Sequence, residues 1–218
     1  MHFKSIYFDL DGVLVDSMEY HSRAWQEVFT EHGVKVTHQM ILENEGALEE
    51  NILYGWFSSQ GKTLESAQLP MLFEKQMSIF KESYLGKVKV FSEVPGILSN
   101  LREEGISLAL VTSSPKNLVE HMLPANILSF FKVVISREMV SRHKPHPDPY
   151  LAAQKHIGQN DGSGLAIENA PPGIRSALGA GLTCYAVTTT LSKNVLQEAH
   201  QVFHGLRELF EFLKKSTN

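Results

Sequence analysis

The stretch Ile6-Tyr7-Phe8-Asp9-Leu10-Asp11-Gly12 joins three consecutive apolar residues to two acids and a glycine. A short apolar run of this kind is typical of a strand that is buried on both faces of a parallel sheet. Ligand sites in such sheets lie outside the carboxyl ends of the strands. The two acids therefore predict a site directly after this strand.

The rest of the chain repeats the pattern of a short apolar run followed by a helix. Stretches with helical spacing separate the runs, and the last of these stretches lies over residues 206–213. Strands that alternate with helices predict an α/β fold with a doubly wound parallel sheet, which is a Rossmann-like core. The further strands are predicted at residues 106–111, 133–135, 165–167, 184–187 and 202–203.

Residues 17–86 interrupt this alternation, because they contain no convincing strand pattern. Their apolar residues have helical spacing instead, for example around Trp25 and Trp56. About 70 residues is too long for a loop in a compact domain and long enough for a small helical bundle. We therefore expect two domains, an α/β core formed by residues 1–16 and 87–218 and a helical cap domain formed by residues 17–86.

The composition narrows the class of protein. The 218 residues include 20 Lys and Arg and 24 Asp and Glu, a net charge of −4, and 43% are hydrophobic. This balance excludes a disordered chain, and the single cysteine, Cys184, excludes a disulfide scaffold. The negative charge argues against nucleic-acid binding, and neither a membrane-spanning run nor an export signal is visible. We expect a cytoplasmic monomer with no nucleic-acid or membrane partner.

Polar side chains follow four of the predicted strands. If the strands form one sheet, carboxylates, hydroxyls, an ammonium group and an amide converge at its edge. That set suits phosphoryl transfer, in which one carboxylate is the nucleophile, another is the general acid, and Mg²⁺ held by Asp9 and nearby oxygens neutralises charge. The converging residues are Asp9 and Asp11, Thr112 and Ser113, Lys144, and Glu168 and Asn169.

The order of these motifs resembles that of the haloacid dehalogenase (HAD) superfamily. FDLDGVLVDS (residues 8–17), LALVTSS (108–114), HKPHPDPYL (143–151) and LAIENAPPGIRSALGAG (165–181) are similar to its four motifs in order. The helical insert lies where the family has its α-helical cap. FDLDGVLVDSMEYHSRAW (8–25) resembles the β-phosphoglucomutase-like phosphatases within that superfamily.

The resemblance implies a role for each matched residue. Asp9 matches the nucleophile that becomes an aspartyl phosphate. Asp11 matches the general acid and base, and its backbone carbonyl is expected to bind Mg²⁺. Thr112 matches the phosphate-binding hydroxyl, with the Ser113 amide beside it. Lys144 matches the lysine that neutralises the nucleophile and the phosphate.

Glu168 and Asn169 match the acidic pair near the metal, although the family more often has Asp at the second position. The amide oxygen of Asn169 can still bind Mg²⁺, but one negative charge is lost. Glu45 in the cap is a candidate replacement, because it precedes a helical stretch and can reach a closed site. We expect Glu45 to complete the metal shell or to contact the leaving group.

Three residues are candidates for contact with the rest of the substrate. His21 lies one helical turn before Trp25 and resembles a position near the site in this group. Lys116 and Asn117 follow the second motif and are expected to bind the substrate's distal polar end. Asp16 and Ser17, in contrast, are expected to cap the first cap helix.

The leading hypothesis is a Mg²⁺-dependent phosphatase that hydrolyses a small phosphorylated metabolite. A sugar phosphomutase is a second hypothesis, but residues 45–51 are acidic and lack the arginine that the mutases have in their cap loop. An inorganic pyrophosphatase is a third. A haloacid dehalogenase is disfavoured because Asp11 is present. A non-catalytic phosphorylation switch or binding module is disfavoured because such modules lack a cap.

Overall fold

The computed structural model describes residues 3–44, 50–158 and 163–215. In this part of the chain six strands form one sheet in the order β3-β2-β1-β4-β5-β6, and every neighbouring pair is parallel. The predicted doubly wound sheet is confirmed. The strands are β1 (Ser5–Phe8), β2 (Ser107–Val111), β3 (Val133–Ile135), β4 (Leu165–Glu168), β5 (Thr183–Val187) and β6 (Gln201–Phe203).

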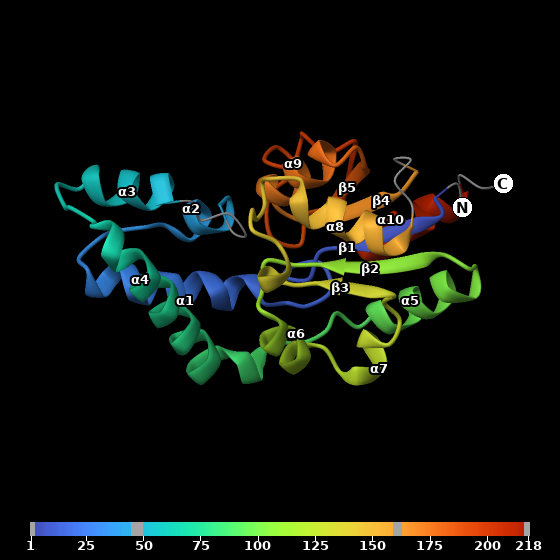
Figure 1. Ribbon diagram of the computed structural model, residues 1–218, viewed down its shortest axis with the longest axis horizontal. Helices are drawn as coiled ribbons and strands as arrows, with labels where there is room; N and C mark the ends of the chain where they lie inside the picture. Colours follow the sequence, from blue (N-terminus) through green and yellow to red (C-terminus); the bar gives the residue numbers. More distant parts are fainter. Residues whose placement is uncertain (1–2, 45–49, 159–162, 216–218) are drawn as a thin grey trace.

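Helices cover both faces of the sheet (Figure 1). Side chains alternate along β1, so Ile6 and Phe8 join one apolar cluster and Tyr7 joins the other. The cluster with Ile6 contains α5 (Val94–Glu103), α6 (Lys116–Met122), α7 (Ala125–Leu128) and α10 (Leu206–Lys215). The cluster with Tyr7 contains α8 (Asp148–Ile157) and α9 (Pro171–Gly179). Burial on both faces explains why the strands are apolar runs without alternation.

A second group of helices lies to one side of the sheet (Figure 1). Its apolar cluster includes Trp25, Phe29, Leu53 and Leu72 and draws only on residues between 25 and 79. This cluster is separate from the two clusters that cover the sheet, and the described residues between 17 and 86 contain no strand, while the division into two domains stays a prediction. The helices are α1 (Met18–Glu31), α2 (His38–Leu42), α3 (Glu50–Ser58), α4 (Leu69–Ile79) and the π-helical turn η2 (Phe80–Tyr84).

Two antiparallel segments connect this cap to the core. Val15 and Val90 form a β-bridge, the Asp16 N–H donates to the Lys89 carbonyl at 2.9 Å, and Phe91 N–H donates to the Leu14 carbonyl at 3.0 Å. The two connections therefore hold each other in register where the cap begins and ends. Short 3₁₀ turns complete the described structure: η1 (Ser66–Gln68), η3 (Leu85–Lys87) and η4 (Arg137–Met139). None of the helices described here is both long and apolar enough to cross a membrane.

Candidate active site

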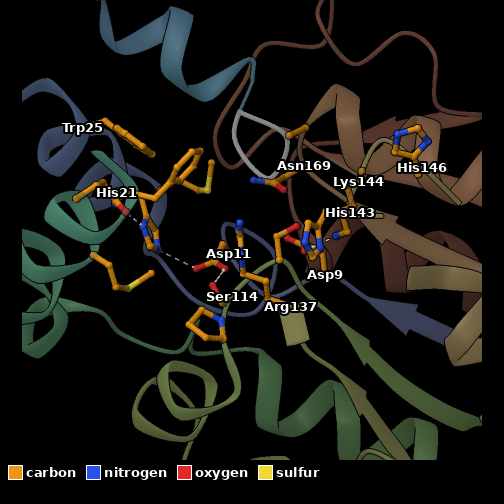
Figure 2. Close-up of a pocket in the computed structure, with 18 of the residues that line it drawn as sticks. Asp9, Asp11, His21, Trp25, Ser114, Arg137, His143, Lys144, His146 and Asn169 are labelled. Atoms are coloured by element: carbon orange, nitrogen blue, oxygen red, sulfur yellow. Dashed lines mark hydrogen bonds and ion pairs between the residues drawn. The ribbon is translucent and has the colours of Figure 1, made fainter. Parts of the chain in front are cut away.

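A cavity of about 1090 Å³ lies between the carboxyl edge of the sheet and the cap helices. Residues that follow different strands meet in its wall, as the strand-end rule predicts. Figure 2 shows side chains from both parts of the chain around this cavity. The core contributes Asp9, Asp11, Ser113, Ser114, Lys144, Glu168 and Asn169, and the cap contributes His21, Trp25 and Gln76.

Lys144 joins two carboxylates at the base of the cavity. Its Nζ donates to Asp9 Oδ1 and to Glu168 Oε1, each at 2.7 Å, and to the Val111 carbonyl at 3.1 Å. Asp9 is 7% exposed, Lys144 4% and Glu168 1%. One buried ammonium group therefore faces two buried carboxylates, which leaves the cluster with an excess negative charge when both acids are ionised.

Burial and the neighbouring charges set the protonation of this cluster. Burial raises the pKa of Asp9 to about 8; Lys144 opposes the rise, while Glu168 and Asp11 add to it. Burial alone favours the neutral amine of Lys144, but Asp9 and Glu168 outweigh it and hold the pKa of Lys144 above its usual range. Lys144 is therefore a permanent cation, and a further cation beside Asp9 favours the Asp9 carboxylate.

The Asp11 carboxylate has a different environment, because hydrogen-bond donors surround it. Ser17 Oγ donates to its Oδ1 at 2.6 Å, and Ser114 Oγ donates to its Oδ2 at 2.9 Å. Burial raises the pKa of Asp11, but hydrogen bonds and charge from His21, Ser17 and Ser114 outweigh burial and lower it overall. The expectation that Ser17 caps the first helix is wrong, because its hydroxyl binds Asp11 and makes no cap hydrogen bond to α1.

His21 links the cap to Asp11. Its Nε2 lies 3.4 Å from Asp11 Oδ1, and its ring stacks on Phe80 with centroids 3.8 Å apart. Gln76 Nε2 lies 3.2 Å from His21 Nδ1. Gln76 therefore contacts the ring nitrogen on the opposite side from the one that faces Asp11. The structure thus places His21 at the site.

The two predicted phosphate-binding residues take different positions. Ser113 lines the cavity. Thr112 is buried behind it, where its Oγ1 accepts from the Ser114 N–H at 3.0 Å and lies 3.5 Å from Asp11 Oδ2. In this arrangement Thr112 organises the loop and does not line the cavity. Its direct contact with phosphate stays a prediction.

Most of the chain matches a known family. The sequence profile described as haloacid dehalogenase-like hydrolase matches residues 6–187, a range that includes all the site residues above. The chain belongs to the haloacid dehalogenase-like hydrolases. It is therefore an enzyme of the hydrolase class, as its four motifs predicted.

Two relatives indicate which group of HAD hydrolases this chain is similar to. It is 28% identical to hexitol phosphatase A of Escherichia coli over 214 residues, which are 96% of this chain and 94% of that protein. It is 26% identical to β-phosphoglucomutase of Bacillus subtilis over 192 residues, which cover 84% and 83% of the two chains. These relatives agree with the predicted β-phosphoglucomutase-like group.

Two further comparisons bear on length and fold. SUPPRESSOR OF QUENCHING 1, a chloroplastic protein of Arabidopsis thaliana, is 32% identical over 200 residues. The match covers 89% of this chain but only 19% of that protein. The crystal structure of a hydrolase from Pseudomonas syringae superposes with a TM-score of 0.86 at 23% identity, over 97% of this chain and 98% of that one. This likeness concerns the fold.

Lys116 and Asn117 do not reach the cavity of the HAD hydrolase. Lys116 Nζ lies 3.9 Å from Glu120, and its backbone N–H donates to Glu138 Oε1 at 3.2 Å. The Asn117 carbonyl lies 2.6 Å from His121 Nδ1. Both residues begin α6 and neither lines the cavity. Their role in substrate binding stays a prediction.

The predicted metal ligands differ in whether their side-chain oxygens already accept hydrogen bonds from neighbouring residues. Asn169 lines the cavity, and because its Nδ2 donates to Thr190 Oγ1 at 3.0 Å, its amide oxygen is left as an acceptor. Glu168 Oε1 accepts from both Lys144 and Tyr150, so its carboxylate is engaged by its neighbours. Glu45 lies outside the described residues. The ligand roles of all three stay predictions.

The donor set nevertheless suits Mg²⁺. Among the described residues no three His, Cys, Asp or Glu side chains form a metal-binding group. The Asp9 carboxylate, the Asn169 amide and backbone carbonyls are hard oxygen donors, and Mg²⁺ is often held by few protein ligands and several waters. Burial raises the pKa of Asp9, and a cation beside this carboxylate would favour its ionised form. The residues therefore fit a divalent cation beside Asp9.

Gly173 is required for the position of Glu168. A Cβ at Gly173 would overlap the Glu168 carboxyl group. We expect Gly173→Ala to push Glu168 away from Lys144, to lower the free energy of unfolding by about 1–3 kcal/mol and to reduce kcat. Chemical unfolding and steady-state kinetics measure both effects.

Gly96 provides the matched control, because it is also the third residue of a helix and also follows proline. No atom lies within 4 Å of a Cβ built at Gly96. Alanine favours helix over glycine by about 1 kcal/mol, so Gly96→Ala is expected to be neutral or stabilising. Equal losses in the two variants would contradict the role of Gly173.

Sequence reasoning missed three residues of the site. Ser114 was not predicted, because it follows Thr112 and Ser113 directly and no pattern in the sequence distinguishes the roles of the three hydroxyls. Tyr150 reads as an apolar position of α8, yet its hydroxyl donates to Glu168 Oε1 at 2.6 Å. Gln76 lies 55 positions from His21, and only the packing of α4 against α1 brings them together.

Proposed function

We propose that the protein is a Mg²⁺-dependent phosphatase that hydrolyses a small phosphorylated metabolite through an aspartyl phosphate on Asp9. The observation that carries the proposal is the pair of contrasting carboxylates in one cavity. Asp9 is bound to Lys144 at 2.7 Å, whereas Asp11 is held by hydroxyls and His21. Two acids in different environments are suited to the roles of nucleophile and general acid.

In the first step an oxygen of Asp9 attacks phosphorus. Lys144 holds Oδ1 of Asp9, which leaves Oδ2 to form the new bond. As the bond from phosphorus to the leaving oxygen breaks, Asp11 gives its proton to that oxygen. A phosphate dianion next to Asp11 raises its pKa, so the substrate itself favours the protonated acid. Mg²⁺, when bound, would neutralise charge on the phosphoryl oxygens.

In the second step water attacks the aspartyl phosphate. Asp11 takes a proton from this water, the bond between phosphorus and Asp9 breaks, and inorganic phosphate leaves. Asp11 is then protonated again, as the next cycle requires. Ser113 lines the cavity beside Asp11 and is the expected donor to phosphate oxygens, whereas the Oγ of Ser114 donates to Asp11 and its N–H donates to Thr112. The cap residues His21 and Trp25 limit the access of bulk water.

The metal requirement is tested by removing the metal. We expect treatment with EDTA to lower phosphate release by at least about a hundredfold, and Mg²⁺ to restore it. Calorimetric titration of the metal-free protein with Mg²⁺ gives a readout that does not depend on turnover. Full activity in EDTA, or no Mg²⁺ binding in the titration, would refute the metal assignment.

A phosphomutase is the second candidate, since a β-phosphoglucomutase is among the relatives. A panel of phosphomonoesters, sugar phosphates and pyrophosphate separates the possibilities. Release of inorganic phosphate supports the phosphatase, and conversion of one sugar phosphate into its isomer supports the mutase. Residues 45–49 of the acidic cap stretch lie outside the described residues, so its predicted effect on the mutase reaction is untested. A cytoplasmic location and a monomeric state also stay predictions.

A further inference from the structure

Arg137 is a cation of the cavity wall that the proposed reaction does not use. It begins η4, two residues after β3 ends, and lines the same cavity as Asp9 and Asp11 (Figure 2). Its backbone N–H donates to the Ser114 carbonyl at 3.1 Å, which ties it to the loop that contacts Asp11. Its guanidinium carbon lies 5.8 Å from the centre of the Phe73 ring in α4. Core and cap therefore both fix its position.

No carboxylate among the described residues lies within 4.0 Å of the Arg137 guanidinium, although the charge of the adjacent Glu138 interacts with it at longer range. Other arginines do have such partners: Arg142 lies 3.1 Å from Asp148, and Arg175 lies 2.8 Å from Glu198. A guanidinium group presents several N–H donors in a planar fork that matches a carboxylate or a phosphate. Arg137 thus presents this fork, with no acid bound to it, in the wall of the cavity.

The surrounding wall is also positive. Apart from the Asp9, Asp11, Lys144 and Glu168 cluster, the charged lining residues are Lys81, Arg137, Glu74 and Arg142, and because Arg142 is paired with Asp148, Lys81 and Arg137 against Glu74 give the excess positive charge. His143 adds no charge near neutral pH, because burial and the nearby Arg137 lower its pKa. A concave wall with excess positive charge concentrates anions. A phosphoryl group bound at Asp9 and Lys144 would leave this second positive region unused.

We propose that Arg137 binds a second anionic group of the substrate, so that the enzyme acts on phosphorylated metabolites that also carry a carboxylate or a second phosphate. The inference rests on the proposed function, because it names the substrate class of the same site. Phe73 holds the guanidinium in place before binding, which reduces the entropy lost when the anion binds. The cation comes from the core, whereas the mutase arginine that this chain lacks belongs to the cap loop.

Binding of stable phosphonates tests this directly and without turnover. Calorimetry on the Mg²⁺-loaded enzyme compares propylphosphonate with phosphonopropionate, which adds a carboxylate, and with propylenebisphosphonate, which adds a second phosphonate. Butyl homologues cover a longer span. We expect at least one of the probes with a second anionic group to bind about tenfold more tightly than its alkyl counterpart. Which probe gains identifies carboxylate or phosphate as the second group.

Arginine variants test whether Arg137 causes the tighter binding of probes with a second anionic group. Arg137→Gln is expected to remove this difference in affinity. Arg102→Gln is the matched control, because Arg102 also lies over an aromatic ring, 5.7 Å from the centre of Phe130, but does not line the cavity. The control should keep the full gain. The proposal is overturned if the wild type binds every probe as weakly as its alkyl counterpart, or if Arg137→Gln keeps the difference.

Turnover gives an independent readout. We expect the ratio of kcat/KM for phosphoglycerate to that for glycerol phosphate to fall about tenfold in Arg137→Gln and to stay unchanged in Arg102→Gln. An equal loss on both substrates would show that Arg137 only supports the fold of the site. If the wild type releases phosphate from neither substrate nor any other phosphomonoester, the phosphatase function fails, while the phosphonate titration still decides the role of Arg137.

Discussion

Asp9→Asn is expected to abolish phosphate release, with a loss in kcat of at least about a thousandfold. An amide oxygen is a far weaker nucleophile than a carboxylate, and it gives a poorer ligand for the cation expected at the site. Asparagine has nearly the same volume, so the fold should persist. Burst kinetics with a chromogenic phosphomonoester measure the loss. Asp16→Asn is the control, because Asp16 is exposed in the same segment and does not line the cavity.

The same variant has a predictable effect on stability in the absence of metal. The pKa of Asp9 rises from 3.8 to about 8 on folding. A raised pKa contributes stability that is complete at low pH and is lost as the pH rises toward about 8. Asp9→Asn has no carboxyl group at this position, so it does not lose this stability as the pH rises. In EDTA the free energy of unfolding of Asp9→Asn minus that of the wild type should therefore increase between about pH 5 and about pH 9. A difference that does not change with pH would contradict the burial argument.

Most of the fold could be predicted because its strands are buried on both faces. β1 and β5 are short apolar runs, and both appear as expected. α2 could not be predicted, because its five residues are too few to show a helical period, and its start depends on the Thr37 side chain accepting the Met40 N–H. Local patterns thus predict elements of ordinary length and fail for single turns.

The site was predictable where chemistry follows directly from a strand end. Asp9 and Lys144 are 135 positions apart, yet both follow strands of one parallel sheet and meet at 2.7 Å. Ser17 shows the limit, because a serine before a helix is an ordinary cap and nothing local indicates its bond to Asp11. Arg137 shows the same limit, since its position depends on Phe73 of the cap. Contacts between core and cap need the tertiary structure.

Lys144→Met is expected to have the largest effect on stability. Removal of the ammonium leaves Asp9 and Glu168 as two buried acids without a cation. Breaking a buried ion pair by removing one partner costs about 3–5 kcal/mol of unfolding free energy, because the remaining charge is uncompensated. We expect a loss of this size in the metal-free protein at about pH 8, with loss of turnover. Urea unfolding measures it, and the exposed Lys155→Met should change stability by less than about 0.5 kcal/mol.

A double variant separates the charge from the packing. Glu168→Gln in the Lys144→Met background removes one of the two uncompensated charges while keeping a side chain that can accept from the Tyr150 hydroxyl, which lies 2.6 Å from Glu168 Oε1. We expect the double variant to be more stable than Lys144→Met by at least about 1 kcal/mol. Turnover should stay lost, because Asp9 still lacks its ammonium partner. If the two variants are equally unstable, lost packing explains the defect. If turnover returns, Lys144 is not needed at Asp9, and the charge balance proposed for the site is wrong.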